Sequence, residues 1–350
     1  MSAATTTLEQ APVHERRRPD LRGWAARGAV MVLLLGGLVF VTAAVPGFWA
    51  DRIAFAAIYG IIGLSLNVIL GYTGQVSLGH HAFVGSSAFV SAYFVTKVAG
   101  CDVGSCSFGD FGMGLLIAVA AGAFMAGVLG LVALRVKGLY LALITLTYGF
   151  VAVNSIFQIP VLTNGGAGMP APRPAGFTGD TAYAFLCLGF LAAALYFDWN
   201  ILRSKAGRSI LAVKHSEDVA ASYGVDVTAY KVIAFVLSGA LAGLAGSLFA
   251  HHNLQVVPSD FGIDTALLWV LMVVVGGLGY RWGVVLASAL FALLPYALAA
   301  FGNGNELNFV VGALLAAATI VFNPGGVGRQ LRPLTRWLSG GPLVARHRSG

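Results

Sequence analysis

The sequence RSKAGRSILAVKHSEDVAASYGVDVTAYK, residues 203–231, is the longest polar segment that lies between apolar stretches of this chain. It contains five basic side chains and three acids, which are Arg203, Lys205, Arg208, Lys214, Lys231, Glu217, Asp218 and Asp226. A charged loop between apolar spans must lie in water, and an excess of lysine and arginine is typical of cytoplasmic loops. We therefore expect a cytoplasmic segment here, with membrane spans on both sides.

The middle of this segment predicts a short helix. Ser216 suits the N-cap position, Glu217 and Asp218 suit the positively polarised first turn, and Gly224 suits the position after the last turn. Such a helix is either a docking element for a soluble partner or only a solvated connector, and residues elsewhere must decide between the two.

The composition indicates an all-α, polytopic membrane protein. Of 350 residues, 58% are hydrophobic and only 10% are charged, whereas soluble domains carry about 25% charged residues. The net charge of +7 is typical of loops that face an anionic membrane leaflet, so no nucleic-acid partner is expected.

A helix needs about 20 apolar residues to cross a bilayer, and this criterion predicts ten spans. They are residues 28–45, 53–70, 78–98, 111–134, 138–158, 181–198, 232–251, 265–280, 283–300 and 307–322. With both termini in the cytoplasm, 18 of the 21 Lys/Arg fall inside, as the positive-inside rule requires. We expect a basic tail at 1–27 without a cleavable signal peptide, a membrane domain at 28–325, and a basic tail at 326–350.

Residues 71–85, GYTGQVSLGHHAFVG, combine glycines with polar side chains beside an apolar stretch. Irregular backbone at membrane depth is tolerated where protein or a watery cavity surrounds it. The pattern predicts a broken or re-entrant segment. The polar side chains of this segment are Gln75, Ser77, His80 and His81. They either line a translocation path or form only a cytoplasmic turn.

The fifth predicted span contains Thr145, Tyr148 and Asn154. Thr145 and Tyr148 are three residues apart, so they share a helix face. Such side chains often bond only to the backbone of their own or a neighbouring helix. Asn154 is costlier to bury and is the better prediction for a functional contact on the path.

Loops and small residues add further expectations. Cys101 and Cys106 share an outside loop and either pair or remain free, whereas Cys187 is expected to act as a small apolar side chain. Residues 159–180 predict an irregular outside loop that could be a docking surface or a gate. The glycines from Gly239 to Gly246 predict close helix packing. His251 and His252 are expected in a wet outside loop.

Motifs for chemistry on this chain are missing. The sequence contains no phosphate-binding G-x-x-x-x-G-K-[ST] loop, no nucleophile elbow and no H-E-x-x-H zinc motif. We expect no enzymatic activity, no cofactor and no metal site. Charged residues within the predicted spans are nearly absent, although secondary transporters commonly keep such residues. The energy for any transport is therefore expected to come from another protein.

Several motifs, in order along the chain, resemble those of branched-chain amino acid ABC transporter permeases. They are GYTGQVSLGHHAF (71–83), GLYLALITL (138–146) with Arg135 before it, TNGGAG (163–168), GRSILAVK (207–214), AASYGVDV (220–227), KVIAF (231–235) and GGLG (276–279). The resemblance covers residues 50–325. The length and the N-terminal extension resemble the longer of the two permease subunits of such importers.

The resemblance implies a bacterial inner-membrane importer. Its partners would be a second permease subunit, two ABC ATPase subunits and an extracytoplasmic solute-binding protein, and its substrates would be leucine, isoleucine and valine. The helix that seats in the ATPase would contain Glu217, Asp218, Ala220, Ala221 and Gly224. Ser222 departs from the family pattern, in which a second acid is common, and His81 stands where a small residue is common.

Other functions stay open on the sequence. Relatives within the same fold move urea, short amides or aromatic acids. An ion-coupled secondary carrier would need buried acids, and a non-transporting scaffold would not need the glycine-rich broken segment.

Overall fold

The structure is a computed structural model, and it describes residues 42, 47–102, 105–133, 136, 138–164, 166–298, 304–322 and 325–330. The predicted tail at 1–27, the predicted span at 28–45 apart from Thr42, and residues 331–350 lie outside the described residues, as does Arg135.

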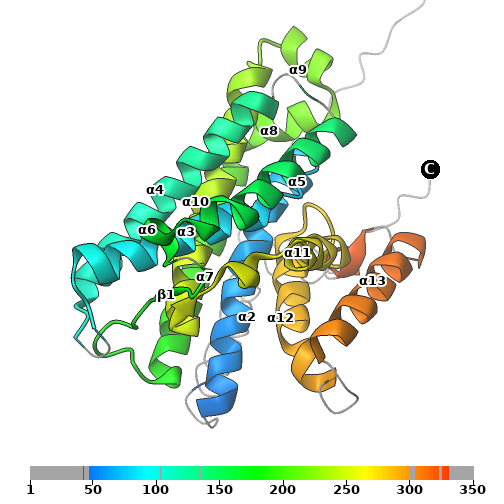
Figure 1. Cartoon of the computed structure of the whole chain (residues 1–350). Helices are drawn as coiled ribbons and strands as arrows, with labels where there is room; N and C mark the ends of the chain where they lie inside the picture. Colours follow the sequence, from blue (N-terminus) through cyan, green and yellow to red (C-terminus); the bar gives the residue numbers. More distant parts are fainter. Residues whose placement is uncertain are drawn as a thin grey trace, which may run out of the picture.

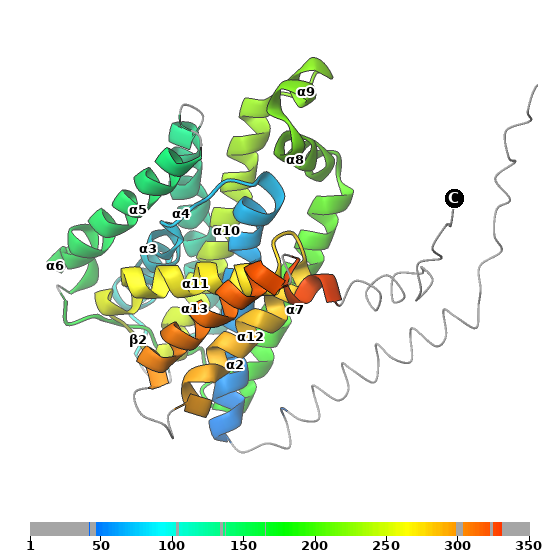
Figure 2. The same cartoon turned by 90° about the vertical axis from the view of Figure 1, so that its right-hand side faces the viewer.

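The regular secondary structure of the described residues is helical apart from one small ladder (Figures 1 and 2). The α-helices are α2 (Gly47–Leu66), α3 (His80–Tyr93), α4 (Phe108–Ala133), α5 (Leu139–Asn154), α6 (Pro160–Thr163), α7 (Asp180–Arg203), α8 (Lys205–His215), α9 (Glu217–Ser222), α10 (Val227–Asn253), α11 (Ile263–Gly276), α12 (Arg281–Leu298) and α13 (Gly304–Phe322). Two π-helical turns, η1 (Asn67–Thr73) and η2 (Phe94–Val98), extend α2 and α3, and two 3₁₀ turns are η3 (Ile156–Gln158) and η4 (Pro258–Phe261).

Strands β1 (Met169–Pro170) and β2 (Gln255–Val256) pair antiparallel, with Met169 opposite Val256. The prediction that residues 159–180 lack regular structure is therefore wrong in part, because they include α6 and β1. Two residues per strand give a weak pairing, which a pattern of alternating polarity cannot reveal.

Six helices within the described residues are long and apolar enough to cross a membrane. They are Gly47–Thr73, Phe108–Val132, Leu139–Gln158, Asp180–Arg203, Val227–Asn253 and Arg281–Leu298. Ile263–Gly276 and Phe309–Phe322 are shorter apolar helices. The predicted span at 78–98 corresponds to α3 and η2. The helical membrane fold is confirmed, and the count of ten spans is not.

Helices α2 and α10 run antiparallel and form the centre of the bundle. α10 packs against α2, α3 and α4, whereas α2 also packs against α7 and α12. Helices α11, α12 and α13 pack on one another beyond α2, and α8 and α9 lie at one end of the bundle (Figure 1). Because both central helices are surrounded by other helices, polar groups on them need partners inside the protein.

Glycines allow α10 to approach α4 closely, as predicted. A side chain at Gly243 would overlap the carbonyl oxygen of Ala118, and one at Gly239 would overlap the carbonyl oxygen of Gly122. Without a hydrophobic driving force between helices in lipid, such close backbone packing is the main source of helix association.

We expect Gly243→Ala to destabilise the bundle, because the new methyl group would collide with backbone atoms that cannot rotate away. Overpacking of this kind costs about 1–3 kcal/mol, and a lower unfolding temperature of the detergent-solubilised chain would report it. Gly189→Ala on α7 is the matched control, because a Cβ there meets no atom within 4 Å. Equal unfolding temperatures for the two variants would contradict the close packing of α10 on α4.

Candidate translocation and coupling sites

Between α7 and α10, the polar segment at 203–231 folds into two helices, α8 and α9, joined at Ser216. The Ser216 hydroxyl accepts a hydrogen bond from the backbone N–H of Val219 at 3.3 Å and caps α9, as predicted. Gly224 follows the last turn with φ of +78°, a conformation that glycine adopts without strain. The predicted short helix, its N-cap and its terminating glycine are confirmed.

Helix α8 was not predicted, although the sequence contains its signal. Gly207, Ile210 and Val213 are three residues apart and buried, which is the spacing of one helix face. Ser204 caps α8 by accepting a hydrogen bond from the N–H of Gly207 at 3.1 Å. The helix was not predicted because the charged side chains outside this buried face make the composition of the segment resemble that of a loop.

The five residues expected to seat in an ATPase do not share one face. The Glu217 carboxylate lies 2.6 Å from the Nζ atom of Lys231, whose side chain is only 4% exposed, and Ala220 is buried. Asp218, Ala221 and Gly224 are exposed. The large apolar side chains exposed at this tip are Val219 and Tyr223, with exposed fractions of 55% and 84%.

The predicted broken segment is confirmed in its backbone. Helix α2 continues into η1, whose wide turns end at Gly74 with φ of +71°. Residues 74–79 are not helical, and α3 begins at His80. Gly74 and Val76 are exposed, whereas Ser77 and Gly79 are buried. The segment is thus a connection whose first half is open and whose second half is packed inside the protein.

Segments far apart in the sequence hold η1 in place. The Nζ atom of Lys214 on α8 donates to the carbonyl oxygen of Gly71 at 2.5 Å. The Oδ1 atom of Asn67 accepts from the N–H of Gly279 at 2.8 Å. A Cβ at Gly71 would lie 2.6 Å from that same N–H, so only glycine fits at this crossing.

The third anchor of η1 is a buried acid that the sequence analysis missed. Tyr72 donates its hydroxyl proton to Oδ2 of Asp198 at 3.1 Å, and Nε of Arg281 lies 3.3 Å from the same oxygen. Asp198 is fully buried near the end of α7. The expectation that charges are nearly absent from the spans overlooked this residue, which was placed at the last position of a predicted span.

His80 joins the three helices at the centre of the bundle. Its Nε2 atom lies 2.6 Å from the Ser65 hydroxyl, and that hydroxyl donates to the carbonyl oxygen of Ser238 at 2.7 Å. The Ser238 hydroxyl donates back to the Ser65 carbonyl oxygen at 2.7 Å. Because each hydroxyl has only one proton, the ring must donate from Nε2. His80 is therefore a hydrogen-bonding link between α2, α3 and α10.

Three other residues predicted for the path have buried polar atoms without a hydrogen-bond partner in the described structure. They are Gln75 with its Oε1 atom, Ser77 with its hydroxyl and His81 with both ring nitrogens. The His81 ring packs so closely on α5 that a Cβ at Gly149 would overlap it. Buried polar groups without partners are costly, and of these three residues Gln75 also lines a polar cavity.

The predicted residues of α5 separate onto two faces. Thr145 is buried, and its hydroxyl oxygen accepts from the N–H of Leu78 at 2.9 Å. The Tyr148 ring packs against Phe83 with ring centres 5.7 Å apart, so Thr145 and Tyr148 share the face toward α3. Asn154 is exposed on the other side, and its Nδ2 atom donates to the carbonyl oxygen of Phe150 at 2.9 Å.

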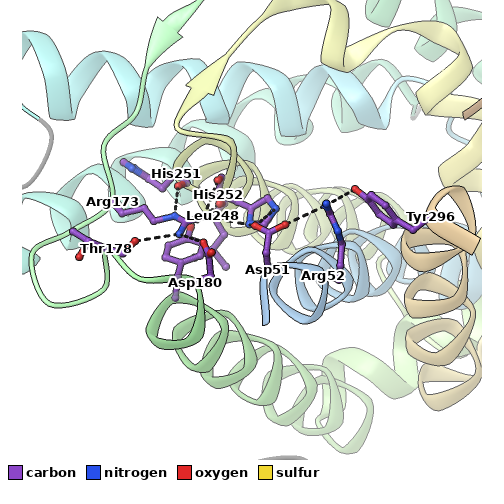
Figure 3. Close-up of polar contacts among 10 residues, drawn as sticks. Asp51, Arg52, Arg173, Thr178, Asp180, Leu248, His251, His252 and Tyr296 are labelled. Carbon is purple, nitrogen blue, oxygen red and sulfur yellow. Dashed lines mark hydrogen bonds and ion pairs between the residues drawn. The ribbon is translucent and has the colours of Figure 1, made fainter. Parts of the chain in front are cut away.

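Arg173 organises the opposite end of the bundle (Figure 3). Its guanidinium donates to the carbonyl oxygens of His251 and His252 at 3.3 and 3.1 Å, and to Oδ1 of Asp180 at 2.7 Å. Its Nη2 atom also lies 3.8 Å from Asp51. A cation at the carbonyl end of a helix opposes the helix dipole, so Arg173 caps α10.

His251 and His252 do not lie in a wet loop, and that prediction is wrong. They form the last turn of α10, and both are buried. The Nδ1 atom of His251 lies 2.8 Å from the carbonyl oxygen of Pro172, and its Nε2 atom lies 3.3 Å from the Ser91 hydroxyl. The helix extends beyond the predicted boundary because the folded loop around Arg173 covers its end.

The structure records Cys101 and Cys106 as free thiols, and both are buried. They cluster with Val95 beside the first turn of α4. Burial, with the neighbouring Cys101, raises the pKa of the Cys106 thiol to about 12. Cys187 is free and buried within α7, as predicted.

We expect Cys106 to react slowly with N-ethylmaleimide at pH 8, because the thiolate is the nucleophile and burial disfavours it. In a Ser222→Cys chain, the exposed new thiol should react at least about 100-fold faster than Cys106. Between pH 7 and 9, the labelling rate of the new thiol at position 222 should rise with pH, while the labelling rate of Cys106 stays low. Peptide mapping by mass spectrometry follows each site. Rapid labelling of Cys106, or a Cys101–Cys106 disulfide, would contradict the buried free thiol.

Two cavities accompany these contacts. A polar cavity of about 310 Å³ lies at the α8–α9 end, between η1 and the polar segment, and is lined in part by Thr73, Gly74, Gln75, Lys214, Ser216 and Glu217. An apolar cavity of about 240 Å³ is lined in part by Ser86, Phe89, Val90, Tyr93, Phe157 and Thr163. Among the described residues, no group of three or more His, Cys, Asp or Glu side chains could hold a metal ion.

Comparisons with known proteins agree with this architecture. The family model described as "Branched-chain amino acid transport system / permease component" matches residues 49–319. The high-affinity branched-chain amino acid transport system permease protein LivM of Salmonella typhimurium is 28% identical over 318 residues, which are 83% of this chain and 72% of LivM. The probable branched-chain amino acid transport permease protein LivH of Methanocaldococcus jannaschii is 26% identical, over 91% of this chain and 95% of LivH.

The structure of PsaBC from Streptococcus pneumoniae in complex with Fab overlaps 85% of this chain and 99% of that chain. Its TM-score is 0.41 and its sequence identity is 13%, values too low to show a shared fold.

Proposed function

The chain belongs to the family of permease components of branched-chain amino acid transport systems, and from this premise we propose that it is a permease subunit of an ATP-driven importer of leucine, isoleucine and valine. The match over residues 49–319 supports the permease role. The names of the relatives support the substrate class.

The observation that carries the proposal is the position of the α8–α9 segment. It presents an exposed tip to solvent and, on its inner side, bonds directly to the broken end of the central helix. A transporter driven by a separate ATPase needs such an element, because force must pass from a soluble partner to the membrane helices. The excess of lysine and arginine here favours a cytoplasmic location, with both termini on the same side.

The interior supports a weakly binding path rather than an ion-coupled one. Asp198 is a fully buried acid among the described residues, and its Oδ2 atom contacts both Tyr72 and Arg281. The cation of Arg281 balances its charge, which favours a structural role, while its Oδ1 atom has no hydrogen-bond partner among the described residues. Gln75, Ser77 and His81 provide polar atoms without partners. Together with Thr145 and Tyr148, they are the proposed contacts of a solute delivered by an extracytoplasmic binding protein. Asn154 lies on the opposite face of α5 and bonds to its own helix, so we do not propose it as a contact.

In the native host, deletion of this chain should abolish high-affinity uptake of labelled leucine, and re-expression should restore it. An ionophore should leave uptake intact while ATP remains high, because the proposed energy source is ATP hydrolysis. Prompt collapse of uptake with the ion gradient would contradict the ATP-driven mechanism. Loss of urea uptake without loss of leucine uptake would contradict the proposed substrate.

Tyr223→Ala should weaken the attachment of the ATPase subunits by about 2 kcal/mol, as expected for an exposed aromatic anchor. Copurification of the ATPase with the tagged permease measures this loss. Tyr196→Ala, which removes an equally large side chain 64% exposed on α7, should leave attachment unchanged. Asp218→Lys tests charge on the same tip without disturbing the buried contact of Glu217 with Lys231. Full attachment in both tip variants would overturn the docking role of α9.

A further inference from the structure

Lys214 makes a contact that neither helix propensity nor core packing requires. It lies in the last turn of α8, where its backbone atoms are part of the polar segment. Its side chain crosses to η1 and places Nζ 2.5 Å from the carbonyl oxygen of Gly71. Its stem also lies beside Gly74, because a Cβ built there would be 3.5 Å from Cγ of Lys214. One side chain thus spans both sides of the end of the broken helix.

The carbonyl oxygen of Gly71 needs a partner of this kind. It belongs to the last turn of a helix, where carbonyl groups have no N–H further along to accept from. The chain turns away at Gly74 and has no helix until His80. An ammonium group satisfies the carbonyl and also opposes the negative end of the helix dipole. Removing it would leave the end of η1 without that partner.

The polar segment is tied to the bundle at a second point. Glu217, at the start of α9, is 2.6 Å from Lys231 on α10. Lys214 and Glu217 are only three residues apart in the sequence, but they contact different central helices. Displacement of the α9 tip therefore reaches α10 through Glu217 and α2–η1 through Lys214.

Space exists for η1 to move at this point. The polar cavity of about 310 Å³ is lined in part by Lys214, by Thr73, Gly74 and Gln75 at and after the end of η1, and by Ser216 and Glu217. The Oε1 atom of Gln75 is buried there without a hydrogen-bond partner. A packed core would resist a shift of the helix end, whereas this cavity accommodates it.

Resting on the proposed function, we propose that Lys214 is a positioning residue that couples movement of α8–α9 to the broken end of the central helix. The bond from Lys214 to the Gly71 carbonyl transmits displacement of the polar segment to residues 71–78. This bond makes ATP hydrolysis productive, because without it the segment moves while the end of η1 does not follow.

The test uses the complete importer purified from its host and reconstituted in proteoliposomes with its binding protein. The measured quantity is labelled leucine transported per ATP hydrolysed. Lys214→Met should lower this ratio about tenfold, since hydrogen bonds from charged groups are among the stronger ones, while ATP hydrolysis continues. Lys214→Arg, which keeps a long cationic donor, should restore most of the ratio. Lys205→Met on the exposed side of α8 is the matched control and should behave as wild type.

A second measurement is independent of the substrate. Amide hydrogen exchange at residues 74–79 should be faster in Lys214→Met than in Lys205→Met, because one of the three anchors of η1, the one at its end, is lost. An unchanged transport ratio together with unchanged exchange in Lys214→Met would overturn the inference. If the wild-type importer hydrolyses ATP but moves no leucine, the proposed substrate fails, and the exchange measurement still decides the role of Lys214.

Discussion

Every backbone polar group inside a membrane protein must find a partner within the protein, and this constraint shapes the centre of the structure. The chain breaks its central helix between η1 and α3, so carbonyl groups near Gly71 lose their place in the helix ladder. Lys214 donates a hydrogen bond to the carbonyl oxygen of Gly71, and Asn67 accepts one from the N–H of Gly279. A broken helix can persist here because distant segments supply these bonds. The break therefore cannot move without the segments that bond to it.

The two central helices run antiparallel, and each ends under a basic side chain from a polar segment. Lys214 bonds to the end of α2–η1, and Arg173 bonds to the end of α10. The first segment is the one proposed to face the ATPase. The second, around Pro172, is the one expected on the outer face. Each end of the bundle thus bonds a connecting segment directly to the backbone of a central helix.

Between these ends, the helices are joined by hydroxyl and imidazole groups rather than by charges. His80 on α3 links Ser65 on α2 with Ser238 on α10. Further along α3 and α10, Ser91 bonds to Ser247 and lies next to His251. Neutral hydrogen bonds and glycine contacts hold membrane helices together without the desolvation cost of ions. The proposed path between such helices would offer a solute polar groups of modest strength, which favours release over retention.

The sequence by itself determined the helical membrane class, the α9 helix with Ser216 and Gly224 at its ends, and the irregular connection before α3. These follow from composition, cap chemistry and glycine placement, which are local properties, whereas the family followed from motifs that resemble those of known permeases. Only the tertiary structure decided where the side chains point. It turned Glu217 inward to Lys231 and brought Asp198 to Tyr72 and Arg281. It also covered the end of α10 with Arg173, which buried two histidines expected in water. These outcomes depend on contacts between residues far apart in the chain, and no local pattern encodes which distant partner a polar side chain will meet.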